Sequence, residues 1–319
     1  MRIFGKIVGL IAALVALLVV SMAVLDRVIP EPMARTLIDL QRSVSGLQLK
    51  QAQIPGFDIP YLEGGPAGGE ALVLVHGIGA DKDNFDRVAM HLTPQMRVIS
   101  IDLPGFGDAS KPADADYSID KQVERLDQFL ATLKIDRVHL GGSSMGGWIM
   151  ASYAAAHPKK VSSLWLLDAA GVATAKPSGV LTAYTERGEY LLFAKTPQDF
   201  DRILLTVMSK PPYLPGSVKQ VVTERAITNY DLHTRIFRDM VASQKPVFLE
   251  SRVAGLLTPT LITWGEEDRA TDVSGAKILH QLIPRSQLQI LPGIGHLPHL
   301  EASSETAQAY LDFRKNLAR

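Results

Sequence analysis

The sequence predicts an α/β protein built on a doubly wound, mostly parallel sheet. Its apolar runs are short and continuous, as expected of strands that helices cover on both faces. Helical patterns separate these runs, and this alternation is typical of parallel sheets with crossover helices. With 319 residues, 46% of them apolar, the chain is long enough to bury a large core. In such a sheet we expect functional residues at the carboxyl ends of the strands.

Continuous apolar runs and one antiparallel pair define the predicted strands. The continuous runs are residues 72–75, 98–101, 138–140, 164–167, 261–263 and 288–291, and the pair is 47–54 with 57–62. Helical patterns lie at residues 84–92, 119–133, 144–157, 276–282 and 305–317. We therefore predict a core formed by residues 47–170 and 258–319.

One interval interrupts the alternation. Between Gly171 and Leu257 no strand pattern occurs, and amphipathic helical patterns replace it at residues 184–194, 197–208 and 217–242. We predict that residues 171–257 form a helical cap inserted into the core. Such an insertion is either an ordinary helical subdomain or a lid that controls access to the site beneath it.

The composition excludes several classes of protein. Lys and Arg together number 33, as do Asp and Glu, so the chain has no net charge with which to attract a nucleic acid. It contains no cysteine, which excludes disulfides, thiolate metal sites and cysteine nucleophiles. The chemistry must therefore use Ser, His, Asp, Glu or Lys, and we expect neither a metal ion nor an organic cofactor.

An apolar segment precedes the core. Residues 7–25 carry no charge, and a helix of this length spans roughly 28 Å against a hydrocarbon core of about 30 Å. We predict that residues 1–30 form a short tail and a transmembrane anchor. The alternative is a cleaved signal peptide, because Ser21 and Ala23 are small residues at the spacing that a signal peptidase reads. The apolar run is longer than that of a usual signal peptide, which favours the anchor.

Residues 31–46 are predicted to form a juxtamembrane amphipathic helix, because apolar residues recur there at helical spacing among charged ones. A short N-terminal tail usually stays in the cytosol, and long domains are translocated largely regardless of their charge. We therefore expect a single-pass membrane protein whose main domain lies outside the cytosol, at the periplasmic face of the inner membrane in a Gram-negative cell. The N-terminal helices can also pair two copies into a homodimer.

The most informative motif is Gly142-Ser143-Ser144-Met145-Gly146, between a predicted strand and a predicted helix. A sharp turn there brings the residues two before and two after Ser144 against neighbouring backbone, where side chains would collide. Gly142 and Gly146 avoid this collision. The turn exposes the Ser144 hydroxyl and places the Met145 amide at a helix N-terminus, where it can stabilise an oxyanion. We predict a nucleophilic serine; the alternative is a glycine-rich structural turn.

A serine hydroxyl needs a base to remove its proton. We predict His296 as this base, because it lies in a Gly/Pro-rich loop directly after the last predicted strand. His299 is the nearest alternative and is more typical of a residue that caps or packs the last helix. His76, in a turn with Gly77 and Ile78, is expected to shape a loop whose Ile78 amide is a second oxyanion donor. We expect the remaining histidines to be structural.

Two residues are candidates for the acid that orients the base. Asp268 follows a predicted strand and precedes His296 by 28 residues, which gives the chain order Ser, Asp, His. Asp168 follows the preceding strand and can reach the same place in some variants of this architecture. The chain order favours Asp268. Its predicted role is to hold the tautomer of His296 whose free nitrogen faces Ser144.

Several motifs occur in a fixed order along the chain: HGIGADKDNF, DLPGFG, GGSSMGGW, WGEED and GHLPHLE. With these motifs, the chain from residue 47 to its end resembles the α/β-hydrolase superfamily. The N-terminal span and the cap sequence KPPYLPG look like those of membrane-anchored monoacylglycerol-lipase-like enzymes and single-span bacterial phospholipases A. The resemblance implies an α/β-hydrolase fold with a helical cap and an N-terminal transmembrane helix.

The same resemblance implies an activity. It assigns Ser144, Asp268 and His296 to a catalytic triad and the amides of Ile78 and Met145 to an oxyanion hole. The implied reaction is hydrolysis of carboxylic esters through an acyl-enzyme. The implied substrates are acyl esters drawn from the bilayer, including lysophospholipids and monoacylglycerols, so the expected partners are the membrane and its lipids.

Other activities remain open at this point. Hydrolases of small esters and C–C bond hydrolases of ring-cleavage products share the triad and the cap, although the latter usually carry H-G-x-G-P-G where this chain has HGIGAD. An acyltransferase differs only in that an alcohol intercepts the acyl-enzyme. The alternative outside the enzymes is a membrane-tethered lipid-binding or signalling protein that retains the fold without turnover.

Overall fold

The computed structural model describes residues 4, 13, 21, 24–242 and 248–317 of the chain. The predicted membrane-spanning run, residues 7–25, therefore lies outside the described residues except at positions 13, 21, 24 and 25. Within the described ranges, no helix is both long and apolar enough to cross a bilayer.

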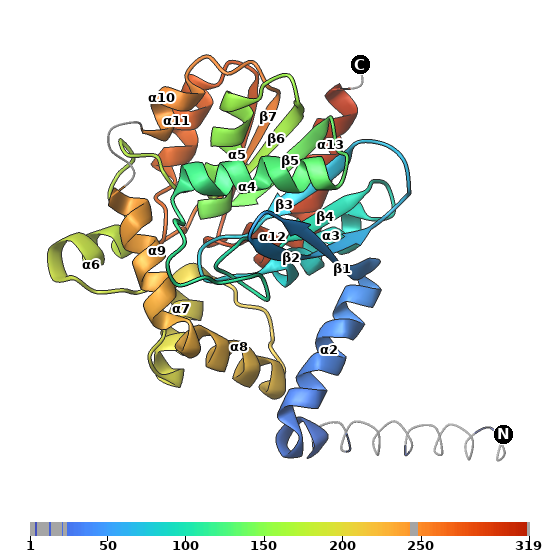
Figure 1. Cartoon of the computed structure of the whole chain (residues 1–319). Helices are drawn as coiled ribbons and strands as arrows, with labels where there is room; N and C mark the ends of the chain where they lie inside the picture. The colour runs from blue at the N-terminus through green and yellow to red at the C-terminus, as the bar shows by residue number, and fades with distance from the viewer. Residues whose placement is uncertain (1–3, 5–12, 14–20, 22–23, 243–247, 318–319) are drawn as a thin grey trace.

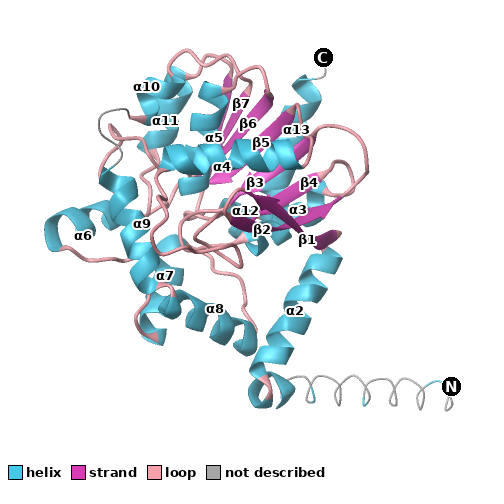
Figure 2. Cartoon of the chain, viewed as in Figure 1, coloured by secondary structure: helices cyan, strands magenta, loops and turns pink. Residues whose placement is uncertain are grey.

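One eight-stranded sheet forms the centre of the molecule (Figure 2), with the strand order β1-β2-β4-β3-β5-β6-β7-β8. β2 runs antiparallel to both of its neighbours, and the other neighbouring pairs are parallel. The strands are β1 (Leu47–Ile54), β2 (Phe57–Gly64), β3 (Ala71–Val75), β4 (Val98–Ile101), β5 (Val138–Ser143), β6 (Val161–Leu167), β7 (Thr260–Gly265) and β8 (Ser286–Leu291).

The predicted α/β class and mostly parallel sheet are confirmed. β1 and β4 have the predicted bounds, and the other strands contain the predicted runs and extend beyond them. The extension of β5 includes Gly141 and Gly142, which offer no apolar side chain and therefore leave no hydrophobic signal in the sequence.

Helices cover both faces of the sheet (Figure 1). Each face of the sheet has its own apolar cluster. Alternate residues of β3 belong to different clusters: Val73 and Val75 lie in one, and Leu72 and Leu74 lie in the other. The first cluster includes side chains of α4 (Ile119–Thr132), α5 (Met145–Ala156), α10 (Leu249–Val253) and α11 (Ser274–Leu282). The second includes side chains of α3 (Asp86–Leu92) and α13 (Ser303–Leu317). Two short helices, the 3₁₀ helix η1 (Lys82–Phe85) and α12 (Pro298–Glu301), precede α3 and α13.

The interval between β6 and β7 is helical, as the sequence indicates, but its helices differ from the predicted ones. They are α6 (Gly179–Arg187), α7 (Pro197–Val207), α8 (Gly216–Thr228), α9 (Tyr230–Ala242) and α10. The prediction of a helix over 184–194 is wrong. α6 starts earlier, because the Ser178 hydroxyl accepts a hydrogen bond from the Leu181 amide, and it ends at Gly188, which has a left-handed φ of 67°. The predicted helix over 217–242 is two helices, interrupted at Asn229.

The helix α2 (Pro30–Val44) lies at the position of the predicted amphipathic helix and packs against α8 of the insertion. Pro30 occupies its first turn, where a missing N–H costs nothing. Just before α2, Asp26 Oδ1 accepts a hydrogen bond from the Ser217 amide at the start of α8, at 3.0 Å. The N-terminal segment is thereby attached to the insertion, and α2 and α8 project from the same side of the core in Figure 1.

A buried charge network fastens the loop that follows β3. The Lys82 side chain has no exposed surface, and its Nζ donates to Asp102 Oδ2 at 2.9 Å and to Asp108 Oδ2 at 2.7 Å.

Two arginines attach other parts of the chain to this loop. The guanidinium of Arg42, from α2, binds both carboxylate oxygens of Asp83 at 2.6 and 2.8 Å. The guanidinium of Arg225, from α8, binds Asp81 at 2.7 Å and Asp108 at 2.9 Å. Core, insertion and α2 therefore meet at one loop.

Candidate active site

Ser144 occupies a strained turn between β5 and α5. Its φ of 53° and ψ of −118° lie in a region that residues other than glycine rarely adopt. The backbone is held there by hydrogen bonds from the Ser144 amide to the Leu167 carbonyl, at 2.9 Å, and from the Ala170 amide to the Ser144 carbonyl, at 2.9 Å. Ser144 lies at the carboxyl end of β5 and is 7% exposed.

The glycines of the motif are required by close backbone approach. A Cβ on Gly142 would lie 2.4 Å from the Gly146 carbonyl carbon, and a Cβ on Gly146 would lie 2.1 Å from the Val75 carbonyl oxygen. A Cβ on Gly77 would lie 3.1 Å from the Ser144 Cβ. The loop after β3 therefore touches the turn that carries the predicted nucleophile.

His76 orients the peptide group that carries the predicted oxyanion donor. Its Nδ1 donates to the Gly77 carbonyl at 2.7 Å, and its Nε2 accepts from the Leu103 amide at 3.2 Å. In a trans peptide the carbonyl and the following N–H point in opposite directions, so the Ile78 N–H points away from His76. Burial lowers the pKa of His76 and keeps the ring neutral, as this bonding pattern requires. The second predicted donor, the Met145 amide, is the first of α5, where N–H groups have no partner within the helix.

His296 and Asp268 form a hydrogen-bonded pair. His296 follows β8, Asp268 follows β7, and the distance from Nδ1 to Asp268 Oδ2 is 2.8 Å. The imidazole is nearly buried and the carboxylate fully so. With its Nδ1 proton directed to Asp268, the imidazole keeps a lone pair on Nε2, as a base requires. Within the described part of the chain, Ser144 Oγ forms no hydrogen bond, a common situation before substrate binds.

Thr271 completes the surroundings of Asp268 and was not predicted. Its hydroxyl donates to Asp268 Oδ2 at 2.7 Å, and the amides of Ala270 and Thr271 donate to Oδ1 at 2.7 and 3.0 Å. Burial acts to raise the pKa of Asp268, but the charge and hydrogen bond of His296, together with the Thr271 donors, outweigh it and lower the pKa. Asp268 is therefore ionised at neutral pH. An aspartate followed three residues later by a threonine is typical of a turn, so the sequence contains a local signal for this contact.

Asp168, the second candidate acid, lies in the same cluster. Side-chain atoms of Asp168, Asp268 and His296 lie within 4.8 Å of one another, a spacing that also suits a metal ion. The imidazole Nδ1 is already bonded to Asp268, so we interpret the cluster as an acid and base pair with an additional carboxyl group. Only Asp268 of the two carboxyls is hydrogen-bonded to His296 among the described residues.

Glu301 joins the loop of His296 to the insertion and was also not predicted. Its carboxylate accepts hydrogen bonds from the amides of Gly295 and Leu297, which flank His296, and from the amides of Ser209 and Lys210, just after α7. The His296 amide itself donates to the carbonyl of Val207, the last residue of α7, at 2.8 Å. The insertion thus fixes the backbone of the predicted base.

His299 packs as a structural residue. Its ring stacks on Phe85 with centroids 4.8 Å apart, and Nε2 donates to Asn84 Oδ1 at 2.7 Å. It therefore joins α12 to η1, next to the loop that carries Ile78. Burial lowers the pKa of His299 to about 3.

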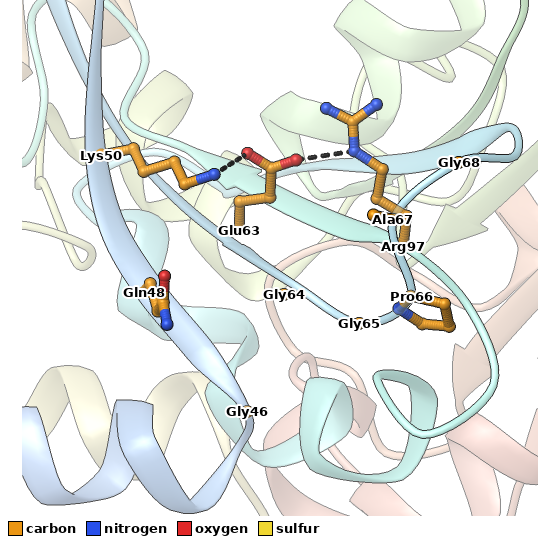
Figure 3. A pocket seen from close by; sticks show the side chains of 10 residues that line it. All are labelled: Gly46, Gln48, Lys50, Glu63, Gly64, Gly65, Pro66, Ala67, Gly68 and Arg97. Atoms are coloured by element: carbon orange, nitrogen blue, oxygen red, sulfur yellow. Dashed lines mark hydrogen bonds and ion pairs between the residues drawn. The ribbon is translucent and has the colours of Figure 1, made fainter.

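A polar hollow with a volume of about 340 Å³ lies at the opposite, amino-terminal edge of β4 (Figure 3). Glu63 lies between its two cationic residues and binds Lys50 at 2.8 Å and Arg97 at 2.6 Å. Both cations are therefore paired with the Glu63 carboxylate, and the hollow lies at the edge of the sheet opposite Ser144, so we assign it no part in the chemistry at the carboxyl edge. Its lining residues are Gly46, Gln48, Lys50, Glu63, Gly64, Gly65, Pro66, Ala67, Gly68 and Arg97.

The fold and this site define a class of protein. Residues 70–303 match the sequence profile of the α/β hydrolase fold family, and the chain belongs to that family. Its sequence is 38% identical over 286 residues to Lipase 1 of Psychrobacter immobilis, with 88% of each chain covered. It is 28% identical over 293 residues to the human monoacylglycerol lipase ABHD6, with 89% of this chain and 87% of that protein covered.

A solved structure is similar over nearly the whole chain. It is the crystal structure of a membrane phospholipase A, described as a bacterial virulence factor, and it superposes with a TM-score of 0.88 at 38% sequence identity. The superposition covers 98% of this chain and 99% of that one. The resemblance inferred from the sequence motifs is confirmed by these comparisons.

Replacing His299 tests the cost of burying a neutral histidine. The unfolded chain binds a proton near the ordinary pKa of 6.5, whereas the folded chain does so only near 3. Stability contributed by the neutral ring is therefore complete above pH 6.5 and is lost as the pH falls towards 3, by at most about 1.4 kcal/mol per pH unit. We expect His299→Gln, which keeps a donor for Asn84, to show a shallower loss of stability between roughly pH 7 and pH 5, as measured by denaturant unfolding. An unchanged slope in His299→Gln, or an equal change in the exposed control His280→Gln, contradicts the assignment.

Removing the Glu301 carboxylate tests whether it positions the base. Glu301→Ala frees four amides and loosens the His296 loop, so we expect kcat for a soluble ester to fall about 10- to 100-fold with little change in KM. Glu305→Ala, an exposed glutamate in the first turn of α13, is the matched control and should retain wild-type kcat. Equal kcat values in the two variants would exclude a positioning role.

Proposed function

We propose that this protein is a membrane-anchored serine hydrolase that cleaves carboxylic esters of lipids. The observation that carries the proposal is the 2.8 Å hydrogen bond between His296 and Asp268, at the same edge of the sheet as the strained turn of Ser144. An oriented imidazole at the same edge of the sheet as a serine held at a sharp turn supports acyl transfer, in which the imidazole takes the serine proton.

Acylation begins when Ser144 Oγ attacks the carbonyl carbon of the ester. The serine proton moves to His296 Nε2, and Asp268 stabilises the imidazolium that forms. Negative charge develops on the carbonyl oxygen, which the Met145 and Ile78 amides bind, each contributing about 3 to 4 kcal/mol by analogy with measured oxyanion holes. The ester C–O bond then breaks, and His296 donates the proton to the leaving alkoxide.

Deacylation repeats these steps with water. His296 takes a proton from water, and the resulting hydroxide attacks the acyl carbon. The bond to Ser144 Oγ breaks, the serine recovers its proton from His296, and a fatty acid leaves. One water is consumed for each ester bond cleaved, and no cofactor takes part in the proposed cycle.

The substrate class is supported by the named relatives, which are lipases, monoacylglycerol lipases and a phospholipase A. Monoacylglycerols and lysophospholipids are the proposed substrates, drawn from a bilayer. Exposed apolar side chains of the insertion support this source: Leu205 on α7 is 61% exposed, and Tyr213 in the following loop is 83% exposed.

We propose that residues 7–25 anchor the chain, with the N-terminus in the cytosol and the catalytic domain outside it, at the periplasmic face of the inner membrane in a Gram-negative cell. Support comes from the uncharged run itself, from exposed Val24 near its end, and from exposed Val28 and Ile29, which follow it. The hydrogen bond from the Ser217 amide to Asp26 holds the residue that follows the proposed anchor beside α8, which supports a position of the insertion near the membrane. A homodimer formed through the N-terminal helices stays a prediction.

Replacing the nucleophile tests the catalytic proposal. We expect Ser144→Ala to lower hydrolysis of monoacylglycerols and lysophospholipids by several powers of ten, because the variant lacks the hydroxyl on which the acyl-enzyme forms. Lipid analysis of membranes incubated with either protein measures the loss, and a fluorophosphonate probe should label the native chain but not the variant. Turnover of these lipids by Ser144→Ala at the wild-type rate would refute the assignment. Retained probe labelling with no lipid cleavage would refute the substrate class alone.

Charges placed in the apolar run test the anchor. We expect the native chain to stay in the membrane after alkaline carbonate extraction, and the double variant Leu14→Lys and Leu18→Lys to be released, because a charge at the bilayer centre costs roughly 2.5 to 3.5 kcal/mol. A protease added to intact spheroplasts should digest the catalytic domain. Release of the native chain together with loss of residues 1–23, seen by mass spectrometry, would instead identify a cleaved signal peptide.

A further inference from the structure

Two carboxyl groups meet beneath the imidazole of His296. Asp168 follows β6 and Asp268 follows β7, and both side chains are fully buried. Atoms of these carboxyls and of His296 lie within 4.8 Å of one another. Asp168 also has a left-handed φ of 47°, and its amide donates a hydrogen bond to the Thr263 carbonyl of β7 at 3.1 Å. The catalytic cycle proposed above uses only Asp268.

The donors around the two carboxyls are unequally distributed. Asp268 accepts four hydrogen bonds, from His296 Nδ1, the Thr271 hydroxyl and the amides of Ala270 and Thr271. Asp168 accepts one on Oδ1, from the Gly265 amide at 2.9 Å. Its Oδ2 is buried and receives no donor from the described residues. Asp268 is therefore the better place for a negative charge.

Two carboxylates this close in a dry site cannot both be ionised. A proton on Asp168 Oδ2 removes the like-charge repulsion and gives that oxygen a partner, because the resulting O–H can donate to Asp268. A proton on Asp268 instead would displace the donors that already surround it. The distribution of donors therefore decides which carboxyl holds the proton.

We propose that Asp168 is a positioning residue, a neutral carboxylic acid whose Oδ2–H donates a hydrogen bond to the Asp268 carboxylate and holds it against His296. The proposal rests on the catalytic pair assigned above and adds a residue behind it. It differs from the role of Asp168 as an alternative ionised acid, which the sequence left open.

The electrostatics agree with this geometry. Burial, followed by the charge of Asp268 and a hydrogen bond with it, raises the pKa of Asp168 well above its usual range, and the nearby charge of Glu301 acts in the same direction. The Gly265 amide acts in the opposite direction, and His296 is the cationic group formed in this cluster during turnover. This shift favours the protonated form of Asp168, and a neutral Asp168 leaves one negative charge, that of Asp268, to orient the imidazole.

Three variants of the full-length protein separate the possible roles of Asp168. In Asp168→Asn the amide Nδ2–H replaces the acid O–H and Oδ1 still accepts from Gly265, so we expect kcat within about threefold of wild type. Asp168→Ala removes the donor, and we expect kcat to fall about 10- to 100-fold with little change in KM. Asp268→Asn, the matched control, should lower kcat by about 1,000-fold or more.

Active-site titration with a fluorophosphonate, carried to completion, corrects each kcat for the fraction of folded enzyme. A purely structural Asp168 would lower that fraction in the Ala variant and leave the corrected kcat unchanged. A loss in Asp168→Asn equal to that in Asp268→Asn would mean that Asp168 acts as an ionised acid. Either result overturns the proposal.

Infrared difference spectroscopy tests the proton directly. At neutral pH the wild-type spectrum minus the Asp168→Asn spectrum should contain the carbonyl stretch of a protonated carboxylic acid. Asp86, whose pKa burial raises to about 9, contributes equally to both spectra and cancels. The absence of this band would refute the neutral acid. Failure of the proposed function would give a different result from failure of this proposal. In that case Ser144→Ala and Asp268→Asn would hydrolyse lipids at the wild-type rate.

Discussion

The strained backbone at Ser144 is the constraint on which the site depends. A serine in that conformation is tolerated only because Gly142 and Gly146 let strand, helix and the loop after β3 approach within distances that no side chain permits. The same close approach brings the Gly77 loop against Ser144. One packing requirement therefore sets the position of the nucleophile and of the peptide group predicted to bind the oxyanion.

The parallel sheet supplies the other groups by a simple geometric rule. β5, β7 and β8 run in the same direction, so the residues that follow them, Ser144, Asp268 and His296, lie at one edge although they are far apart in sequence. The strands bring these three residues to one edge of the sheet. Buried hydrogen bonds then fix the positions of the acid and of the base. Thr271 and Glu301 provide these bonds, the first to the acid and the second to the backbone around the base.

Features with local signals could be predicted from the sequence. Continuous apolar runs identified β3 to β8, a pair of neighbouring segments identified β1 and β2, and the spacing of Gly142, Ser144 and Gly146 identified the turn, because all of these signals depend on neighbouring residues. Glu301 could not be found in this way, since it binds Ser209 from 92 residues away and only the folded chain brings them together. The wrong bounds predicted for α6 have another cause. Ser178 and Gly188 are ordinary helix-capping residues, but the prediction followed the apolar pattern of residues 184–194 instead.

Two kinds of contact attach the insertion to the core, the ion pairs of Arg225 in the charge network around Lys82 and the backbone hydrogen bond between His296 and Val207. Arg225 is about one-third exposed where it binds Asp81 and Asp108, so dissolved ions screen these pairs. Lys82, with no exposed surface, is sheltered from that screening, as is the buried backbone contact between His296 and Val207. Raising the ionic strength therefore weakens the attachment of the insertion at Arg225 before it disturbs the attachment at Val207, next to the imidazole, which gives the molecule a defined order in which its parts come apart.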